Sequence, residues 1–260
     1  MQNLSHTIRK FNRFELKYLV MIREAENIKK ALGAYLTPDD HGNFYGSYPL
    51  VSLYYDSPDY RFYREKVDGI RFRRKLRIRW YETGTPLTSD TAVFVEIKQR
   101  LNRVTQKRRV LLPYCDALRL CNQREAPDHA PQDHAVIDEI LSMCWQYELQ
   151  PASVVMYARQ ALVGSDYDIG LRVTFDKDLR YRTHNLALDE PDAGQLLFPP
   201  DWVVMEIKIN ERIPYWLTEL VAQHNLNLVR VSKYCRSIEL AQQVTTAQDV
   251  AVRAGQFRLA

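Results

Sequence analysis

One ten-residue stretch restricts the fold of this chain more than any other, because charge alternates with hydrophobicity along it. Within RFRRKLRIRW, residues 71–80, basic side chains occupy every second position: Arg73, Lys75, Arg77 and Arg79. Apolar side chains follow each of the last three basic positions: Leu76, Ile78 and Trp80. Such alternation predicts a β-strand with one basic and one apolar face. The stretch alone leaves a solvated outer face, a nucleic-acid patch and an anion site open as interpretations.

Three other predicted strands carry a Glu-x-Lys pair with both charges on one face and apolar residues on the other. The pairs are Glu15 and Lys17 in FELKYLV, Glu96 and Lys98 in VFVEIKQ, and Glu206 and Lys208 in VVMEIKI. A single such pair is typical of a surface salt bridge, which contributes little to stability. Three pairs, together with the basic strand and with Arg159 and Arg172, favour a charged interior shared by several strands. A closed barrel provides one, because each strand turns alternate side chains inward.

Hydrophobic periodicity predicts about eight strands with a few helices between them. The expected strands are 13–21, 51–56, 72–81, 93–99, 106–112, 153–162, 170–175 and 202–209. Helices are expected at 23–36, 134–148 and 213–224, with a last helix capped by Ser232. We expect a surface loop at 122–133 and assign no role to the tail after residue 244. Because the sequence contains no linker and no internal repeat, we expect one α+β domain over residues 1–260, with a sheet that curls or closes.

Composition narrows the protein class. The 260 residues carry a formal charge of only +4, and the four cysteines lack metal-site spacing, so no zinc site or disulfide framework is expected. The N-terminus has no apolar signal segment, and no window approaches the roughly 18 apolar residues of a membrane span. We therefore expect a cytoplasmic chain, and docking onto a membrane protein partner stays open.

The expected interior suits a phosphate chain. Arg binds phosphate oxygens in a bidentate fork, and Lys supplies compact point charges. Carboxylates among so many cations are explained if one or two of them hold Mg²⁺ or Mn²⁺. The chain has no Gly-rich phosphate loop, nucleophile elbow or Cys/His dyad, which argues against P-loop, hydrolase and thiol mechanisms. Nucleic acid is disfavoured as a partner, because a narrow interior accommodates a thin phosphate chain more easily than a chain that carries bases.

Eight motifs, in this order, resemble those of the VTC domain, the polyphosphate polymerase domain of the triphosphate tunnel metalloenzyme superfamily. They are FELKY, SLYYD, KLRIRWY, VFVEIKQR, YARQA with LRVTFDKDLRYR, VVMEIKI, IPYW and SKYCRS, and the resemblance spans about residues 9–242. It implies an eight-stranded antiparallel β-barrel, the triphosphate tunnel, with peripheral helices. It also implies a basic interior that binds ATP or another nucleoside triphosphate and inorganic polyphosphate, with Mn²⁺ or Mg²⁺ as cofactor.

The resemblance also implies roles for residues at matching positions. Catalytic cations are expected at Lys17, Arg77, Arg79, Lys98 and Lys233. Substrate contacts are expected at Arg159 and Arg172, and at Lys107 or Arg109, between which the motif does not decide. The charged strand faces add Arg73, Lys75 and Lys208 as further expected substrate contacts. The metal carboxylate is Glu206, whereas Glu15 and Glu96 stay open between metal ligands and structural partners of neighbouring cations. Tyr54, Tyr55 and Asp56 are expected to serve packing and the turn.

One departure bears on function. The thiamine-triphosphatase and adenylate-cyclase branch of the superfamily opens with E-x-E-x-K, whereas this chain has Arg13-x-Glu15-x-Lys17. Replacing a carboxylate by a cation favours the polymerase-type branch, in which the γ-phosphate of ATP moves onto a polyphosphate chain. The alternatives are a tripolyphosphatase or nucleoside triphosphatase, and a non-catalytic polyphosphate-binding module. A membrane subunit is a further expected partner, because the family's eukaryotic complexes contain one.

Overall fold

The computed structural model describes residues 14–39, 46–82, 84–102, 104–164, 168, 170–210 and 212–243. Arg13 and the tail after residue 244 lie outside these ranges. In the described part of the chain, no helix has both the length and the apolar character needed to cross a membrane.

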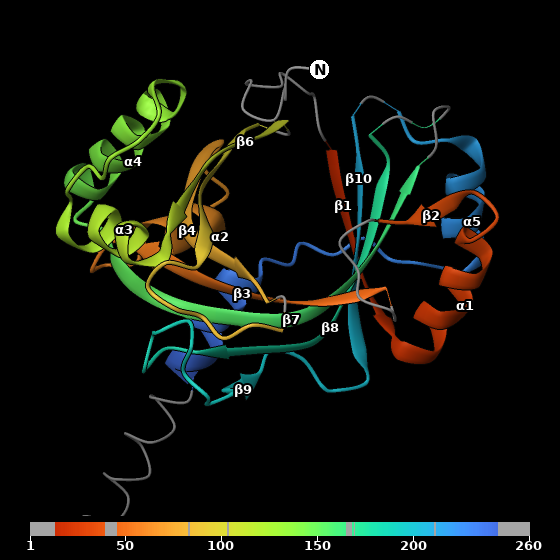
Figure 1. The fold of residues 1–260 in the computed structure, drawn as a ribbon. Helices are drawn as coiled ribbons and strands as arrows, with labels where there is room; N and C mark the ends of the chain where they lie inside the picture. The colour runs from red at the N-terminus through yellow and green to blue at the C-terminus, as the bar shows by residue number, and fades with distance from the viewer. Residues whose placement is uncertain are drawn as a thin grey trace, which may run out of the picture.

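A large antiparallel sheet forms the body of the molecule (Figure 1). Its eight main strands are β1 (Phe14–Met21), β10 (Trp202–Ile209), β8 (Arg172–Arg182), β7 (Gln150–Gly164), β3 (Ser47–Asp56), β4 (Phe72–Tyr81), β5 (Ala92–Leu101) and β6 (Val104–Pro113), in spatial order. Two short strands pair beside this path, β2 (Leu36–Pro38) with β7 and β9 (Gln195–Leu196) with β8. All eight strands expected from the sequence are present, and the α+β class is confirmed.

The sheet curls around a central space but does not close. Its edge strands β1 and β6 have no backbone pairing with each other among the described residues. A side-chain ion pair spans this seam instead, because Lys98 on β5 donates to both carboxylate oxygens of Glu15 on β1, at 2.7 and 2.8 Å. The expected barrel is therefore correct in strand number, direction and curvature, but it is open along one seam.

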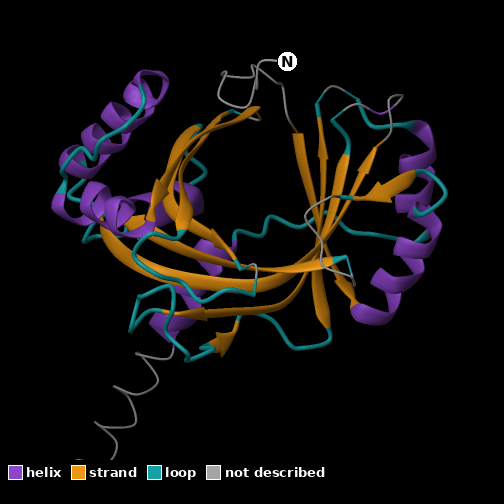
Figure 2. Ribbon diagram, viewed as in Figure 1, coloured by secondary structure: helices purple, strands orange, loops and turns teal. Residues whose placement is uncertain are grey.

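The helices lie outside the curled sheet (Figure 2). Helices α1 (Ile22–Leu32) and α5 (Tyr215–Gln223) cover β1 and β10 on one flank, and α3 (Tyr114–Leu118) and α4 (His134–Gln146) cover the other (Figure 1). A last helix, residues 233–243, begins after Ser232, whose Oγ accepts a hydrogen bond from the Cys235 amide at 3.3 Å. The predicted cap is confirmed. The short helices α2 (Arg61–Val67) and α3 had not been predicted, and neither had the π-helical turn Arg119–Gln123, which extends into the expected loop.

The apolar faces of the strands point outward, and the helices bury them. Leu76 and Ile78 of β4 pack with Ile97 of β5 against Ile137 and Ile140 of α4, and all five are fully buried. Burying each such side chain stabilises the fold by about 1.5–3 kcal/mol. Because the apolar faces are satisfied from outside, the polar faces of the same strands are left to line the interior.

Arg182, at the end of β8, organises the loop that follows it. Its side chain is only 1% exposed, and its guanidinium donates to the carbonyl oxygens of Asn185 at 2.8 Å, Glu190 at 3.1 Å and Asp192 at 2.5 Å. Ala187 supplies a further carbonyl acceptor. One buried side chain thus satisfies the backbone of a whole loop.

We expect Arg182→Met to lower the free energy of unfolding by about 3 kcal/mol or more, because four loop carbonyls lose their donor and a hydrogen bond to a charged group contributes about 1.5–3 kcal/mol. The half-buried neighbour Arg180 is the matched control, since it pairs with Asp178 at 2.9 Å and makes only one long hydrogen bond, of 3.4 Å, to a loop carbonyl, that of Gly194. Arg180→Met is expected to cost less than about 1 kcal/mol. Urea denaturation of both variants measures the difference. Equal losses would show that the carbonyl contacts do not hold this loop.

Candidate functional site

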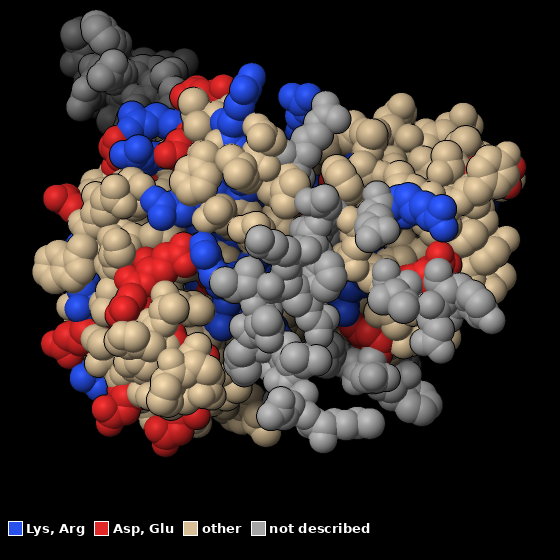
Figure 3. Space-filling model, turned by 90° about the horizontal axis from the view of Figure 1, so that it is seen from above, with Lys and Arg blue, Asp and Glu red and all other residues tan. Residues whose placement is uncertain are grey.

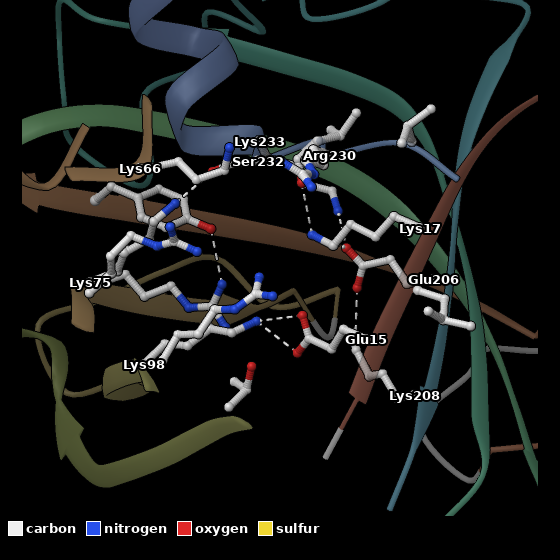
Figure 4. A pocket seen from close by; sticks show the side chains of 18 of the residues that line it. Glu15, Lys17, Lys66, Lys75, Lys98, Glu206, Lys208, Arg230, Ser232 and Lys233 are labelled. Atoms are coloured by element: carbon white, nitrogen blue, oxygen red, sulfur yellow. Dashed lines mark hydrogen bonds and ion pairs between the residues drawn. The ribbon is translucent and has the colours of Figure 1, made fainter. Parts of the chain in front are cut away.

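The inward faces of the strands enclose a cavity of about 830 Å³ (Figure 4). Thirteen Lys and Arg residues line it, against two carboxylates among the described residues, Glu15 and Glu206. The cations are Lys17, Lys66, Arg71, Arg73, Lys75, Arg77, Arg79, Lys98, Arg100, Arg159, Lys208, Arg230 and Lys233. Viewed from above, several blue Lys and Arg side chains lie toward the middle of the molecule, and most of the red acidic side chains lie on its left side (Figure 3). Positive potential is thus concentrated in a chain whose net charge is small.

Arg77 and Arg79 are held by neighbours on the adjoining strands. Arg77 donates through Nε at 2.8 Å and Nη2 at 2.5 Å to one oxygen of Glu96, and through Nη1 at 3.0 Å to the Tyr54 hydroxyl. Arg79 donates to the hydroxyls of Ser52 at 3.0 Å and Tyr157 at 2.9 Å. Burial would raise the pKa of Glu96, yet Arg77 keeps it well below its usual value. Arg77 is therefore charge-compensated, whereas Arg79 has only neutral partners among these contacts.

Glu206, on β10, lies at the centre of four cations. The nitrogens of Lys233, Lys208 and Lys17 lie at 3.0, 3.1 and 3.2 Å from its carboxylate, and Arg159 lies at 3.8 Å. Burial would raise the pKa of Glu206, but these cations lower it well below its ordinary value. The carboxylate is therefore ionised and brings four like charges into one small volume.

A second buried carboxylate, Asp176 on β8, supports this cluster. Arg159 binds it with two parallel hydrogen bonds of 2.6 and 2.7 Å, and Lys233 approaches it at 2.6 Å. Burial alone would lower the pKa of Lys233, but Asp176 and Glu206 together raise it well above its usual value. Lys233 is therefore a permanent cation, and the last helix that carries it is tied to the cavity wall.

Two cavity groups titrate close to neutral pH. Burial lowers the pKa of Lys208 to about 7, even though Glu206 favours its charged form. Burial raises the pKa of Tyr54, but Arg77, Arg79 and Lys75 outweigh it and bring it to about 8. Both groups lie where an anionic ligand would stabilise the protonated form.

Most residues singled out from the sequence meet in this cavity. Those on its lining are Glu15, Lys17, Arg73, Lys75, Arg77, Arg79, Lys98, Arg159, Glu206, Lys208 and Lys233. Lys98 binds Glu15 across the seam, and Lys75 donates to Ser232 Oγ at 2.6 Å. Figure 4 shows Lys75 and Lys98 on one side of the cavity and Lys17, Glu206 and Lys208 on the other. The shared interior expected from the Glu-x-Lys strands therefore exists.

Four of the singled-out residues do not line the cavity. Glu96 is fully buried, with its second oxygen bound by Lys107 at 3.1 Å. Arg109 covers the ring of Phe94 at 4.1 Å. Arg172 binds the carboxylate of Asp39. These contacts give each of the four a partner at the periphery of the site, and a direct contact with a ligand in the cavity is not visible for any of them.

The sequence analysis also missed several residues in or beside the cavity. Asp176 does not itself line the cavity, but it holds the lining cations Arg159 and Lys233. It alternates with Thr174 and Arg172 along β8, so period-two reasoning could have placed it on the inner face. Tyr157 precedes Arg159 on β7 by the same spacing. Tyr54, which was expected to pack, lines the cavity through the same alternation in β3. Four more cations lie where strand alternation gives little or no guidance. Lys66 lies in α2, and Arg71, Arg100 and Arg230 lie near strand ends or in loops.

The arrangement can bind a linear polyanion. Cations from β1, β4, β5, β7, β10 and the last helix line one cavity, and the two carboxylates on its lining are each paired with lysine. Arg forks and Lys ammonium groups at several levels match a ligand that carries one charge at each of many repeating units.

This chain is similar in sequence to known proteins. The sequence family model of the VTC domain matches residues 12–242 of this chain. Subunit 4 of the vacuolar transporter chaperone complex is 28% identical in Trypanosoma brucei brucei and 27% identical in Trypanosoma cruzi, each over 228 residues and 73% of this chain. The chain spans only 28% of the length of these relatives.

Among solved structures, a candidate adenylyl cyclase from Hippeastrum, described as having a dominant triphosphatase activity, has a TM-score of 0.49 and 13% identity. The alignment covers 85% of this chain and 93% of that one. A candidate adenylate cyclase from Bacillus halodurans has a TM-score of 0.48 and 14% identity over 85% of this chain and 95% of that one. At these scores the likeness carries no functional argument. The family model alone covers most of the chain, and this chain therefore belongs to the VTC domain family.

Proposed function

We propose that this chain is a metal-dependent phosphotransferase that moves the γ-phosphate of ATP onto a polyphosphate chain held in the basic cavity. The observation that carries the proposal is the excess of thirteen Lys and Arg residues over two carboxylates on one enclosed surface. Phosphoryl transfer needs little covalent chemistry from the protein, so positioned cations supply most of the catalysis. Membership of the VTC domain family and the name of the complex that contains the relatives support the same class of function.

Within the cavity, each cation has a proposed task. Arg77, Arg79, Lys98, Lys17 and Lys233 would hold the reacting phosphates, because they line the cavity from several sides. A second set would hold the rest of the chain: Arg73, Lys75, Arg159 and Lys208. The peripheral cations Lys107, Arg109 and Arg172 would act through their partners rather than by direct contact.

A divalent metal fits this site as a companion of the phosphate chain. Within the described ranges, no three or more His, Cys, Asp or Glu side chains are grouped so as to hold an ion. Mg²⁺ and Mn²⁺ bound with nucleotides need only one or two protein carboxylates, because phosphate oxygens supply other ligands. Glu206 and Glu15 would be those carboxylates. The ion would neutralise charge on the phosphate oxygens that lie opposite these two carboxylates.

The alternatives differ in their products. When the protein is incubated with ATP and Mn²⁺, we expect chains longer than triphosphate, resolved by gel electrophoresis, together with ADP. Release of orthophosphate without chains would instead identify a triphosphatase. Tight binding of polyphosphate without turnover would identify a binding module. Either result would contradict the proposed transfer reaction.

We expect Arg79→Met to weaken polyphosphate binding about ten-fold or more, because it removes a charge-assisted contact of about 1.5–3 kcal/mol. Arg79 is the preferred site because its hydrogen-bond partners are neutral. Removing Arg77 would instead leave the buried carboxylate of Glu96 without its main partner. Isothermal titration calorimetry with long-chain polyphosphate measures the change. Arg108, which binds Glu139 away from the cavity, is the matched control, and Arg108→Met should bind normally. Unchanged binding by Arg79→Met would exclude the cavity as the polyphosphate site.

Binding is also expected to depend on pH. Lys208 has a pKa of about 7 in the free protein, so above neutral pH it is largely uncharged. A bound polyanion favours the ammonium form and raises that pKa, so binding at pH values above 7 takes up a proton and weakens as pH rises. Tyr54, with a pKa of about 8, adds to the effect in the same direction.

Calorimetry at pH 8 in buffers of different ionisation enthalpy measures this proton uptake. Long-chain polyphosphate is the appropriate ligand, because nearly all its phosphates are fully ionised. We expect Lys208→Met to reduce the uptake and Lys208→Met/Tyr54→Phe to abolish it. Uptake that persists in the double variant would assign the proton to another group.

A further inference from the structure

Large apolar side chains stand exposed at the opening of the basic cavity and on the strand ends beside it. Five of them, with exposed fractions between 42% and 64%, form what we term the mouth rim: Val67, Ile70, Phe72, Leu101 and Leu228. Val67, Ile70 and Leu228 also line the cavity, so the cavity meets solvent where they lie. Phe72 and Leu101 do not line the cavity. They are cross-strand partners at adjoining ends of β4 and β5, on the outer face that also carries Leu76 and Ile97, and each is next in sequence to a residue that does line the cavity, Arg71 or Asn102.

Cations lie between these apolar side chains. The backbone of Arg71 links the two parts of the rim, because its carbonyl accepts a hydrogen bond from the Asn102 amide at 2.9 Å. Five cations share the rim: Lys66, Arg71, Arg73, Arg100 and Arg230. None of the five forms an ion pair with another residue in the described part of the chain. Asp68 lies in the same turn, and the charges of Glu65 and Glu239 act on Arg73 and Lys66, so cations outnumber acids at the rim.

The rim needs an occupant that is both anionic and apolar. A second copy of this chain does not meet this need, because a two-fold contact would place the same cations against each other. A single apolar helix or strand does not match either, since the apolar side chains are separated by charges and belong to three segments. A lipid bilayer with anionic headgroups accepts both kinds of side chain at once, whatever their spacing.

We propose that the mouth rim docks this chain on an anionic lipid surface. Phe72, Leu101 and Ile70 enter the boundary between headgroups and acyl chains, and the arginines between them contact the lipid headgroup anions. The chain would bind as a peripheral protein, with the opening of its cavity turned toward the bilayer. The docking does not depend on which phosphate ligand the cavity holds or on whether that ligand is turned over.

Sedimentation with lipid vesicles tests the proposal. We expect the full chain to sediment with phosphatidylcholine vesicles that contain about 30% phosphatidylserine, at about 0.1 M salt, and to bind pure phosphatidylcholine at least about five-fold more weakly. The variant Phe72→Ser/Leu101→Ser should lose at least about five-fold in the bound fraction. Neither residue lines the cavity, so its polyphosphate affinity should match that of the unmodified chain, which also shows that it folds.

A matched control removes exposed apolar side chains elsewhere. Tyr215 on α5 is 76% exposed and Leu196 on β9 is 36% exposed, and Tyr215→Ser/Leu196→Ser should sediment normally. Equal sedimentation of the rim variant and the unmodified chain would overturn the proposal. So would a lack of binding to anionic vesicles. A dimer in light scattering that the rim variant alone loses would assign the rim to a second copy instead.

Discussion

The structure depends on keeping many like charges close together inside a protein. Buried carboxylates make this possible, because Glu206 and Asp176 each hold at least two cations and have little or no contact with water. Removing a carboxylate of this kind would leave uncompensated charge in a region of low dielectric constant, which is strongly destabilising. The acids are thus the framework on which the cations are arranged, and the excess of cations is what remains for a ligand.

This constraint explains why the barrel is built with its hydrophobic faces outward. A conventional small barrel fills its interior with apolar side chains. Here the helices α1, α4 and α5 cover the outside of the sheet, so the core of the protein lies between helix and sheet. Side chains in the interior are then not needed to form the hydrophobic core. They can be long, charged and separated by solvent without a loss of core burial.

The fold and most of the site could be predicted from alternation in the sequence. The face that carries Arg77 and Arg79 was assigned by period two, and so were the three Glu-x-Lys pairs. The same rule could not separate Glu96 from Glu206, because one is covered by Arg77 and Lys107 while the other reaches the cavity, and that difference is set by neighbouring strands. Loop cations such as Arg230 carry no periodic signal. Whether the sheet closes depends on contacts between β1 and β6, which are far apart in the sequence, and local patterns do not encode such contacts.

The open seam between β1 and β6 has a mechanical consequence. A barrel closed by a ladder of hydrogen bonds has a fixed bore, whereas this one is joined along the seam by the ion pair of Glu15 and Lys98. Widening the bore there breaks side-chain contacts and no backbone ladder among the described strands. The distance between β1 and β6 can therefore change to admit ligands of different width, such as a bare phosphate chain and one that carries hydrated ions.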